Sequence, residues 1–285
     1  MEKQSVTELI EKYKLPESEH KTVLELLKNN LFTDKIAEEK PSIMFVVGQP
    51  GCGKTTFIKN TNFPKYTIIN SDDYRSLSKY YKEILDKYPT DYAKLTNFDA
   101  HLWGDELFSC AIQNGYSVLR EKAPTDFSLL ELIKMIPSSY EIVINVVVAG
   151  NLSSLLATRE RYEKEIRESS HAKLSNIEAH NTCYDLLPDF ISGCVALGIK
   201  VNYIIFVDNQ YEMIPVGDDY LELLLKLRKE SNHQAYLHYD TRIDTIKSSM
   251  TNRNATQEQF DELKKIEKVY SEISSYGDDE KIHRK

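Results

Sequence analysis

A glycine-rich segment directly after a run of apolar residues constrains the fold of this chain more than any other feature. Residues 43–47 read IMFVV, and residues 48–56 read GQPGCGKTT. The second segment fits the pattern G-x-x-x-x-G-K-[ST], which binds phosphate when a buried strand precedes it and a helix follows it. A continuous apolar run is typical of a strand buried on both faces, and residues 53–60 have a helical pattern. The sequence therefore predicts a phosphate-binding P-loop.

Each residue type in this segment has a physical role in holding phosphate. Glycines let successive backbone N–H groups turn toward an anion, and the start of the following helix adds its positive dipole end. Lys54 is expected to reach the β- and γ-phosphates of ATP, and the Thr55 hydroxyl is expected to ligate Mg²⁺. ATP, as co-substrate, and Mg²⁺ are therefore the predicted cofactors. The predicted nucleotide-binding residues of the loop are Gly48, Gln49, Pro50, Gly51, Cys52, Gly53, Lys54, Thr55 and Thr56.

The central region of the chain alternates between apolar runs and helical patterns. Strands that alternate with helices form a parallel sheet with helices on both of its faces. The predicted fold class is therefore α/β with a mostly parallel central sheet. Strands are expected at 43–47, 66–70, 116–120, 140–150 and 201–208, and helices at 53–60, 73–87, 98–113, 151–168 and 174–198.

Helical segments are predicted on both sides of this core. Residues 1–38 have helical apolar spacing, with a break at LPES, and they are a candidate cover for the nucleotide site. The composition changes after about residue 215, and residues 255–275 have i, i+4 charge pairs and a capping residue at Thr256. We therefore divide the chain into residues 1–38, a P-loop core at 39–214 and a C-terminal helical appendage at 215–285. One hypothesis makes this appendage a protein-interaction element.

Composition and charge exclude several classes of partner. The formal net charge is −8, which argues against nucleic acid or an anionic membrane as the main partner. The sequence contains no apolar run of membrane-spanning length, and its charged first twenty residues do not resemble a secretory signal. Its four cysteines show no CxxC spacing, so free thiols in the cytoplasm are expected rather than disulfides or a zinc site.

A P-loop alone fits a GTPase, a motor ATPase or a kinase, and the acidic residues after the second predicted strand favour a kinase. The chain has no [NT]KxD motif for guanine recognition. A kinase needs a carboxylate near the end of the second strand, where the acceptor hydroxyl faces the γ-phosphate. Asp72 and Asp73 follow that strand. Either can instead cap the next helix, and Asp72 is the preferred candidate for the catalytic base.

Five segments together resemble the zeta toxin family. They read GQPGCGKTT, NSDDYR, NGYSVLRE, RERYEKE and HAKLSNIEAHN, in this order, and the similarity extends from about residue 40 to 210. Zeta toxins are kinases of toxin–antitoxin systems that phosphorylate UDP-N-acetylglucosamine, a peptidoglycan precursor. The resemblance implies a P-loop kinase-like three-layer fold and a toxin acting against cell-wall synthesis. It also implies a small helical antitoxin as a protein partner.

The resemblance also implies roles for residues outside the loop. Asp72 aligns with the catalytic base, and Arg161 and Lys173 align with positions that contact the triphosphate. The predicted catalytic residues are Asp72, Lys54 and Arg161. The predicted acceptor-binding residues are Asp72, Asp105, Glu121 and Thr125, the last of which stands where the family has an arginine.

The chain departs from the family pattern mainly on the acceptor side. The typical EGT after the third strand is replaced by Glu121-Lys122-Ala123, and Lys173 replaces an arginine. The acceptor can therefore be another nucleotide-sugar, a nucleoside or a dinucleotide, or the chain can be a degenerate ATP-binding regulatory module. Arg161 can also simply pair with Glu165 on a charged helix face. Arg159 and Arg161 point in different directions on a helix, so only one of them is expected to face the nucleotide.

Overall fold

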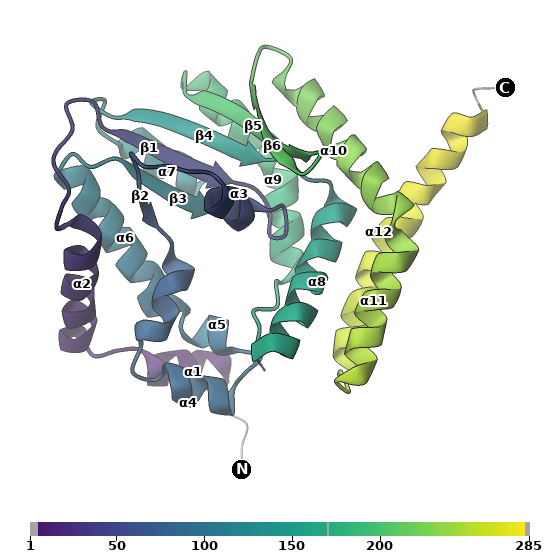
Figure 1. The fold of residues 1–285 in the computed structure, drawn as a ribbon, viewed down its shortest axis with the longest axis horizontal. Coiled ribbons are helices and arrows are strands. Elements are labelled where there is room, and N and C mark those ends of the chain that lie inside the picture. Colours follow the sequence, from purple (N-terminus) through teal and green to yellow (C-terminus); the bar gives the residue numbers. More distant parts are fainter. Residues whose placement is uncertain (1–4, 170, 283–285) are drawn as a thin grey trace.

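The protein is built around a single six-stranded sheet. The structure, a computed structural model, describes residues 5–169 and 171–282, and for 274–282 the backbone alone. The strand order is β2-β3-β1-β4-β5-β6, in which the first five strands run parallel and β6 pairs antiparallel with β5 (Figure 1). The strands are β1 (Ser42–Val47), β2 (Thr67–Ile69), β3 (Val118–Lys122), β4 (Glu141–Val147), β5 (Lys200–Val207) and β6 (Gln210–Pro215). The predicted α/β fold with a mostly parallel sheet is confirmed.

Strand β1, which leads into the P-loop, lies at the centre of the sheet. It pairs with β3 on one side and with β4 on the other, and all of its residues are buried. Its continuous apolar sequence fits this burial, because helices cover both faces of a parallel sheet. Since parallel strands end at the same edge, the P-loop emerges beside the ends of β3 and β4.

Two helical layers cover the two faces of the sheet. Phe45 of β1 belongs to a core with Trp103 and Phe190, whereas its neighbour Val46 belongs to a core on the other face with Phe57. This alternation follows from the two-residue period of a strand and gives the three-layer arrangement. The helical elements between the strands are α3 (Lys54–Asn60), η1 (Ser71–Leu77), α4 (Tyr81–Lys87), α5 (Tyr92–Leu95), α6 (Asn97–Gln113), α7 (Ser128–Met135), α8 (Asn151–Ser169) and α9 (Ile177–Ala196).

Three local differences from the sequence prediction have clear causes. The prediction of one helix over 73–87 is wrong, because the extended residue Ser78 separates the 3₁₀ helix η1 from α4. The sequence analysis missed α7, which has only eight residues. It also missed β6, an edge strand whose mixed polar and exposed residues give no buried-strand pattern.

The N-terminal segment forms two helices that cover the α5–α6 side of the molecule. They are α1 (Val6–Tyr13) and α2 (Glu17–Phe32), separated at residues 14–16. The ring nitrogens of His20 lie 2.9 Å from Asp99 Oδ1 and 2.8 Å from Glu106 Oε2, and Trp103 Nε1 donates to the His20 carbonyl. Helix α1 contacts α5 and α2 contacts α6. These contacts lie away from the P-loop, so they do not support the idea that this segment covers the nucleotide site.

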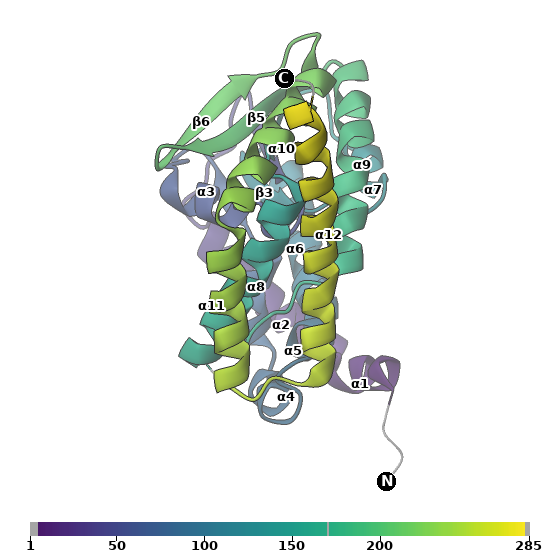
Figure 2. The same ribbon diagram turned by 90° about the vertical axis from the view of Figure 1, so that its right-hand side faces the viewer.

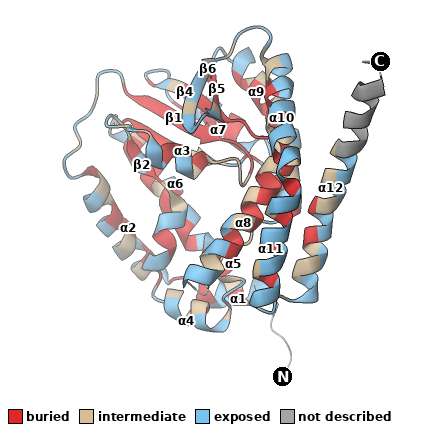
Figure 3. Cartoon of the chain, turned by 45° about the vertical axis from the view of Figure 1, so that its right-hand side comes forward, coloured by how far each residue is buried: buried red, intermediate tan, exposed pale blue. Residues whose placement is uncertain are grey.

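The C-terminal segment forms three helices that all contact α8, and α10 also packs into the core beside the sheet (Figure 2). They are α10 (Tyr220–Leu237), α11 (Tyr239–Asn252) and α12 (Gln257–Ile282). Thr256 and Gln259 exchange backbone-to-side-chain hydrogen bonds at the start of α12, as expected for a capping residue at 256. Apolar residues of α8, α11 and α12 share one buried cluster, and Figure 3 shows the buried residues along α8. Within the described part of the chain, none of the helices is long and apolar enough to cross a membrane.

Candidate active site

The glycines of the P-loop hold a backbone path that other residues would not adopt. Gly48 has φ +149° and Gly51 has φ +80°. A Cβ atom at Gly51 would lie 2.1 Å from the carbonyl oxygen of Ser154 in α8. At Gly48 it would lie 2.6 Å from Cys52 Sγ. The loop is therefore pressed against α8, and its shape depends on glycine at both positions.

Lys54 and Thr55 begin α3 and meet one carboxylate, that of Glu121. Lys54 is buried, and its Nζ donates to the carbonyl oxygens of Gly48 at 2.8 Å and Gln49 at 3.1 Å. The same Nζ lies 3.8 Å from Glu121 Oε1, and Thr55 Oγ1 donates to Glu121 Oε2 at 2.8 Å. The lysine ammonium thus lies over the loop, where it is available to a bound phosphate.

A buried network of hydrogen bonds holds the P-loop against α8 and α9. The Gln49 side chain donates to the Ala149 carbonyl at 2.9 Å and to Ser154 Oγ at 3.2 Å. Ser154 Oγ lies 2.8 Å from His180 Nε2, and His180 Nδ1 lies 2.9 Å from Asn181 Oδ1. Burial lowers the pKa of His180. Sequence reasoning missed this network, because its members come from three distant segments and form no motif.

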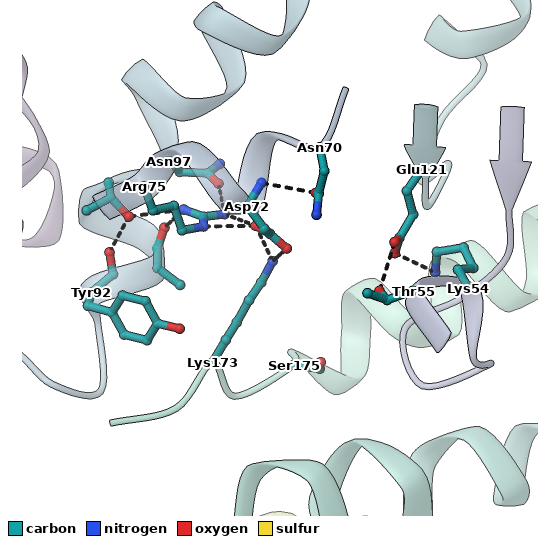
Figure 4. A network of polar contacts seen from close by, with 12 residues as sticks. Lys54, Thr55, Asn70, Asp72, Arg75, Tyr92, Asn97, Glu121, Lys173 and Ser175 are labelled. Carbon is teal, nitrogen blue, oxygen red and sulfur yellow. Dashed lines mark hydrogen bonds and ion pairs between the residues drawn. The ribbon is translucent and has the colours of Figure 1, made fainter. Parts of the chain in front are cut away.

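Asp72 lies in η1, between two cations. It accepts hydrogen bonds from Arg75 Nε at 2.8 Å and Nη2 at 2.6 Å, and from Lys173 Nζ at 2.9 and 3.0 Å (Figure 4). Burial raises the pKa of Asp72, but Lys173 and Arg75 outweigh it and hold the pKa at about 2. The carboxylate is therefore ionised at neutral pH.

The capping role that Asp72 and Asp73 could have filled belongs to Asn70. The Asn70 side chain accepts a hydrogen bond from the backbone N–H of Asp72. The Asp72 carboxylate is thus free for contacts with side chains, and both Asp72 and Asp73 are exposed. Arg75, which orients Asp72, is itself held by the Ala93 carbonyl and by Asn97. Sequence reasoning did not assign a role to Arg75, although its position in NSDDYR, three residues after Asp72, suits such a contact.

Asp105 and Glu121 lie on opposite faces of β3. Asp105 of α6 accepts a hydrogen bond from Arg120 Nη2 at 2.9 Å and lies 3.8 Å from Lys122 Nζ. Burial, with a further contribution from Arg120, lowers the pKa of Lys122 to about 8. Because strand side chains alternate, Arg120 and Lys122 face α6 while Glu121 faces α3. Thr125 is exposed in the segment between β3 and α7.

Arg161 of α8 and the segment carrying Lys173 meet beside these clusters. Arg161 Nη2 donates to Ser175 Oγ at 3.1 Å, and its Nε lies 3.7 Å from Glu165 Oε1. The surface ion pair considered from the sequence is thus present, together with the contact to Ser175. Arg159 points elsewhere and lies 3.1 Å from Glu262 of α12.

The Lys54–Thr55–Glu121 cluster and the Asp72–Arg75–Lys173 cluster face each other at the carboxyl edge of the sheet. Figure 4 shows both clusters in one view, with Asn70 and Ser175 between them. The loop offers N–H groups and an ammonium to a triphosphate, and the opposite side offers an ionised carboxylate. Described residues include no group of three or more His, Cys, Asp or Glu side chains suited to a metal. The hydroxyl of Thr55 and the carboxylate of Glu121 are nevertheless the oxygen donors that Mg²⁺ uses alongside phosphate.

The P-loop follows a central strand of a mostly parallel sheet, and helices cover both faces of this sheet. This arrangement is that of a P-loop protein with a kinase-like α/β fold. A protein-family model described as zeta toxin matches residues 28–209, more than half of the chain. The chain belongs to the zeta toxin family.

Curated relatives and solved structures agree with this assignment. The chain is 25% identical to toxin zeta of Streptococcus agalactiae over 171 residues, covering 58% of this chain and 60% of that protein. It is 24% identical to toxin zeta of Enterococcus hirae over 183 residues, covering 59% and 64%. The matched region thus spans somewhat under two thirds of these relatives.

Similarity to solved structures concerns the fold. A structure from the PezAT chromosomal toxin–antitoxin system of Streptococcus pneumoniae superposes with a TM-score of 0.66 at 21% identity, covering 82% of this chain and 98% of that one. The AvrRxo1-ORF1:AvrRxo1-ORF2 complex with sulphate ions gives a TM-score of 0.51 at 13% identity, covering 74% and 72%. Both confirm the P-loop kinase-like architecture.

Proposed function

We propose that this protein is an ATP-dependent phosphotransferase that moves the γ-phosphoryl group of ATP to a hydroxyl of a small molecule. The observation that carries the proposal is an ionised carboxylate, Asp72, at the same sheet edge as the P-loop lysine. A loop alone would support nucleotide binding only. The carboxylate opposite the loop adds the group that an acceptor alcohol needs.

Each site residue has a role in this transfer. The P-loop amides and Lys54 hold the β- and γ-phosphates, and Arg161 and Lys173 approach the migrating phosphoryl with positive charge. Asp72 orients the acceptor hydroxyl and takes its proton as the new O–P bond forms. Lys173 is well placed to shift between Asp72 and phosphate, because a lysine ammonium has no fixed fork geometry. Asp105 and Thr125 are proposed to contact the acceptor, whereas Glu121, which was assigned to the acceptor from the sequence, lies with Thr55 on the nucleotide side.

Magnesium fits the oxygen donors beside Lys54. Thr55 and Glu121 would hold the ion, and when bound it would neutralise charge on the β- and γ-phosphates. Glu121 in this role would also fix the Thr55 hydroxyl, to which it is already hydrogen-bonded.

UDP-N-acetylglucosamine is the acceptor that family membership favours, and a toxic effect on cell-wall synthesis would follow from its phosphorylation. The relatives are named toxin zeta, and a structural neighbour comes from a toxin–antitoxin system. A helical antitoxin partner is proposed on the same ground. Lys122 and Ala123, which replace the typical residues after Glu121, are the reason for testing other nucleotide-sugars, nucleosides and dinucleotides as well.

The acceptor is identified by incubating the full chain with ATP, Mg²⁺ and candidate acceptors, and analysing the products by mass spectrometry. A mass increase of one phosphoryl group on UDP-N-acetylglucosamine supports the family acceptor. Phosphorylation of another member of the panel keeps the kinase and changes its substrate. Tight ATP binding with no product from the whole panel would instead favour the degenerate regulatory module.

A further inference from the structure

Helix α8 has one face toward the C-terminal helices and another toward the active site. Arg159, Glu160 and Glu163 pair with residues of α11, its C-terminal cap and α12. Arg161 lies between them in sequence but contacts Ser175 on the active-site side. The charged RERYE segment is therefore divided: most of its side chains hold the C-terminal helices, and one reaches toward the nucleotide site.

Glu163 is the most completely paired of these side chains. It is buried, and its Oε1 accepts a hydrogen bond from Arg253 Nη2 at 2.7 Å. Its Oε2 accepts from Arg253 Nε at 2.8 Å and from Ser249 Oγ at 3.0 Å. Arg253 also donates to Gln259 Oε1 at 2.8 Å, so one guanidinium joins α8 to the start of α12. A two-pronged arginine–carboxylate pair fixes direction as well as distance.

Apolar packing already joins these helices. Leu155 and Leu156 of α8 share a core cluster with Ile246 of α11 and Ile266 of α12. A buried ion pair adds little stability to such a contact, because desolvation of the charges offsets their attraction. What the pair can add is a defined rotation and register of α8 against the C-terminal helices.

The rotation and register of α8 affect two parts of the candidate active site, the P-loop and Arg161. The carbonyl of Ser154 limits the path of Gly51 in the P-loop, and Arg161 approaches the segment that carries Ser175 and Lys173. A small rotation of α8 would move the Arg161 guanidinium, which lies about two turns further along the helix than Ser154. Displacements of this size at a charge-stabilising group reduce phosphoryl-transfer rates strongly.

We propose that α11 and α12 brace α8 so that Arg161 is positioned for phosphoryl transfer, with Glu163 and Arg253 as the positioning residues. This inference rests on the proposed kinase function. It assigns the C-terminal helices to the catalytic unit, in place of a separate protein-interaction element.

A double-mutant cycle between Glu163→Gln and Arg161→Ala tests the brace in the full-length protein. Glu163→Gln keeps the side-chain shape and is expected to lower kcat about tenfold, with the Kd for ATP unchanged within about twofold. In the Arg161→Ala background the same substitution is expected to change kcat less than about twofold. Arg253→Lys, which keeps the charge and loses the fork, is expected to give an intermediate loss. Lys247→Gln, which removes the exposed α11–α12 pair with Glu267, is the matched control and should leave kcat unchanged.

The outcomes separate this inference from the proposed function. Equal losses of kcat from Glu163→Gln in both backgrounds would overturn the brace while leaving the kinase intact. Losses that follow the melting temperature across all variants, including Lys247→Gln, would also overturn it, because they indicate a purely structural role. No effect of Arg161→Ala on kcat would remove both the brace and the role proposed for Arg161. An absence of phosphoryl transfer from the unmodified protein would remove the proposed function itself.

Discussion

Asp72 and Asp73 are adjacent in sequence and both are exposed, but they differ in their ion pairs. Asp72 is held by Arg75 and Lys173, whereas Asp73 takes part in none of the ion pairs between described residues. The folded-state pKa of Asp72, about 2, lies below the ordinary value of about 3.9. Its pairing therefore contributes stability above about pH 4, and this contribution is lost as the pH falls toward 2. At neutral pH the carboxylate is ready to accept a proton once an acceptor displaces one of its cations.

Replacing Lys173 is expected to raise the pKa of Asp72. Lys173→Gln removes the cation that lowers the pKa of Asp72 most, so this pKa is expected to rise. The acidic limb of the kcat–pH profile should then move to higher pH, and kcat should fall because a charge near the phosphate is lost. Lys134→Gln, at an exposed ion pair of α7, is the control. An acidic limb that stays in place in Lys173→Gln would contradict the assigned pairing.

Gly51→Ala is expected to abolish ATP binding. The added Cβ would lie 2.1 Å from the Ser154 carbonyl, and the residue has φ +80°. Gly198→Ala is a matched control, because its φ is +71° but nothing lies within 4 Å of the added atom. The control should lose about 1–2 kcal/mol of stability from backbone strain and keep its ATP affinity. Isothermal titration calorimetry measures both affinities, and wild-type binding by Gly51→Ala would refute the proposed packing of the loop.

At the scale of elements, α8 carries Arg161 and contacts both the P-loop and the C-terminal helices. Ile266→Ala in α12 is expected to cost about 2–5 kcal/mol in urea unfolding, since the residue is fully buried against this core. Leu225→Ala in α10, where the side chain is 63% exposed, should change stability by less than about 0.5 kcal/mol. Similar effects at both positions would mean that the C-terminal helices do not share a core with α8.

The parts of the site that are local in sequence could be predicted, and the parts that depend on tertiary contacts could not. The P-loop is read from one short segment because strand, glycines, lysine and helix follow one another directly. The contact between Glu163 and Arg253 joins positions 90 residues apart, and no pattern in either segment specifies it. His180 reads as an ordinary helix residue, and only the packed structure brings it to Ser154. The edge strand β6 was not predicted, because half-exposed strands lack a continuous apolar run.

At the scale of the whole molecule, the chain is acidic but several of its cations lie around the candidate active site. The net charge is −8, while Lys54, Arg75, Lys173 and Arg161 gather around the P-loop and Asp72. A local positive region in an acidic protein attracts a small polyanion such as ATP without favouring long nucleic acids. The helical segments at both ends complete this unit, α2 against α6 and α11 with α12 against α8.

The rate of phosphoryl transfer by Asp72→Asn, measured at saturating ATP and compared with Asp73→Asn, tests the central claim most directly. We expect Asp72→Asn to bind ATP within about twofold of wild type and to transfer phosphate at least about 100-fold more slowly. Asp73→Asn, changed at the neighbouring exposed position, should match the wild-type rate. Transfer by Asp72→Asn at the wild-type rate would contradict the assignment of this carboxylate as the base.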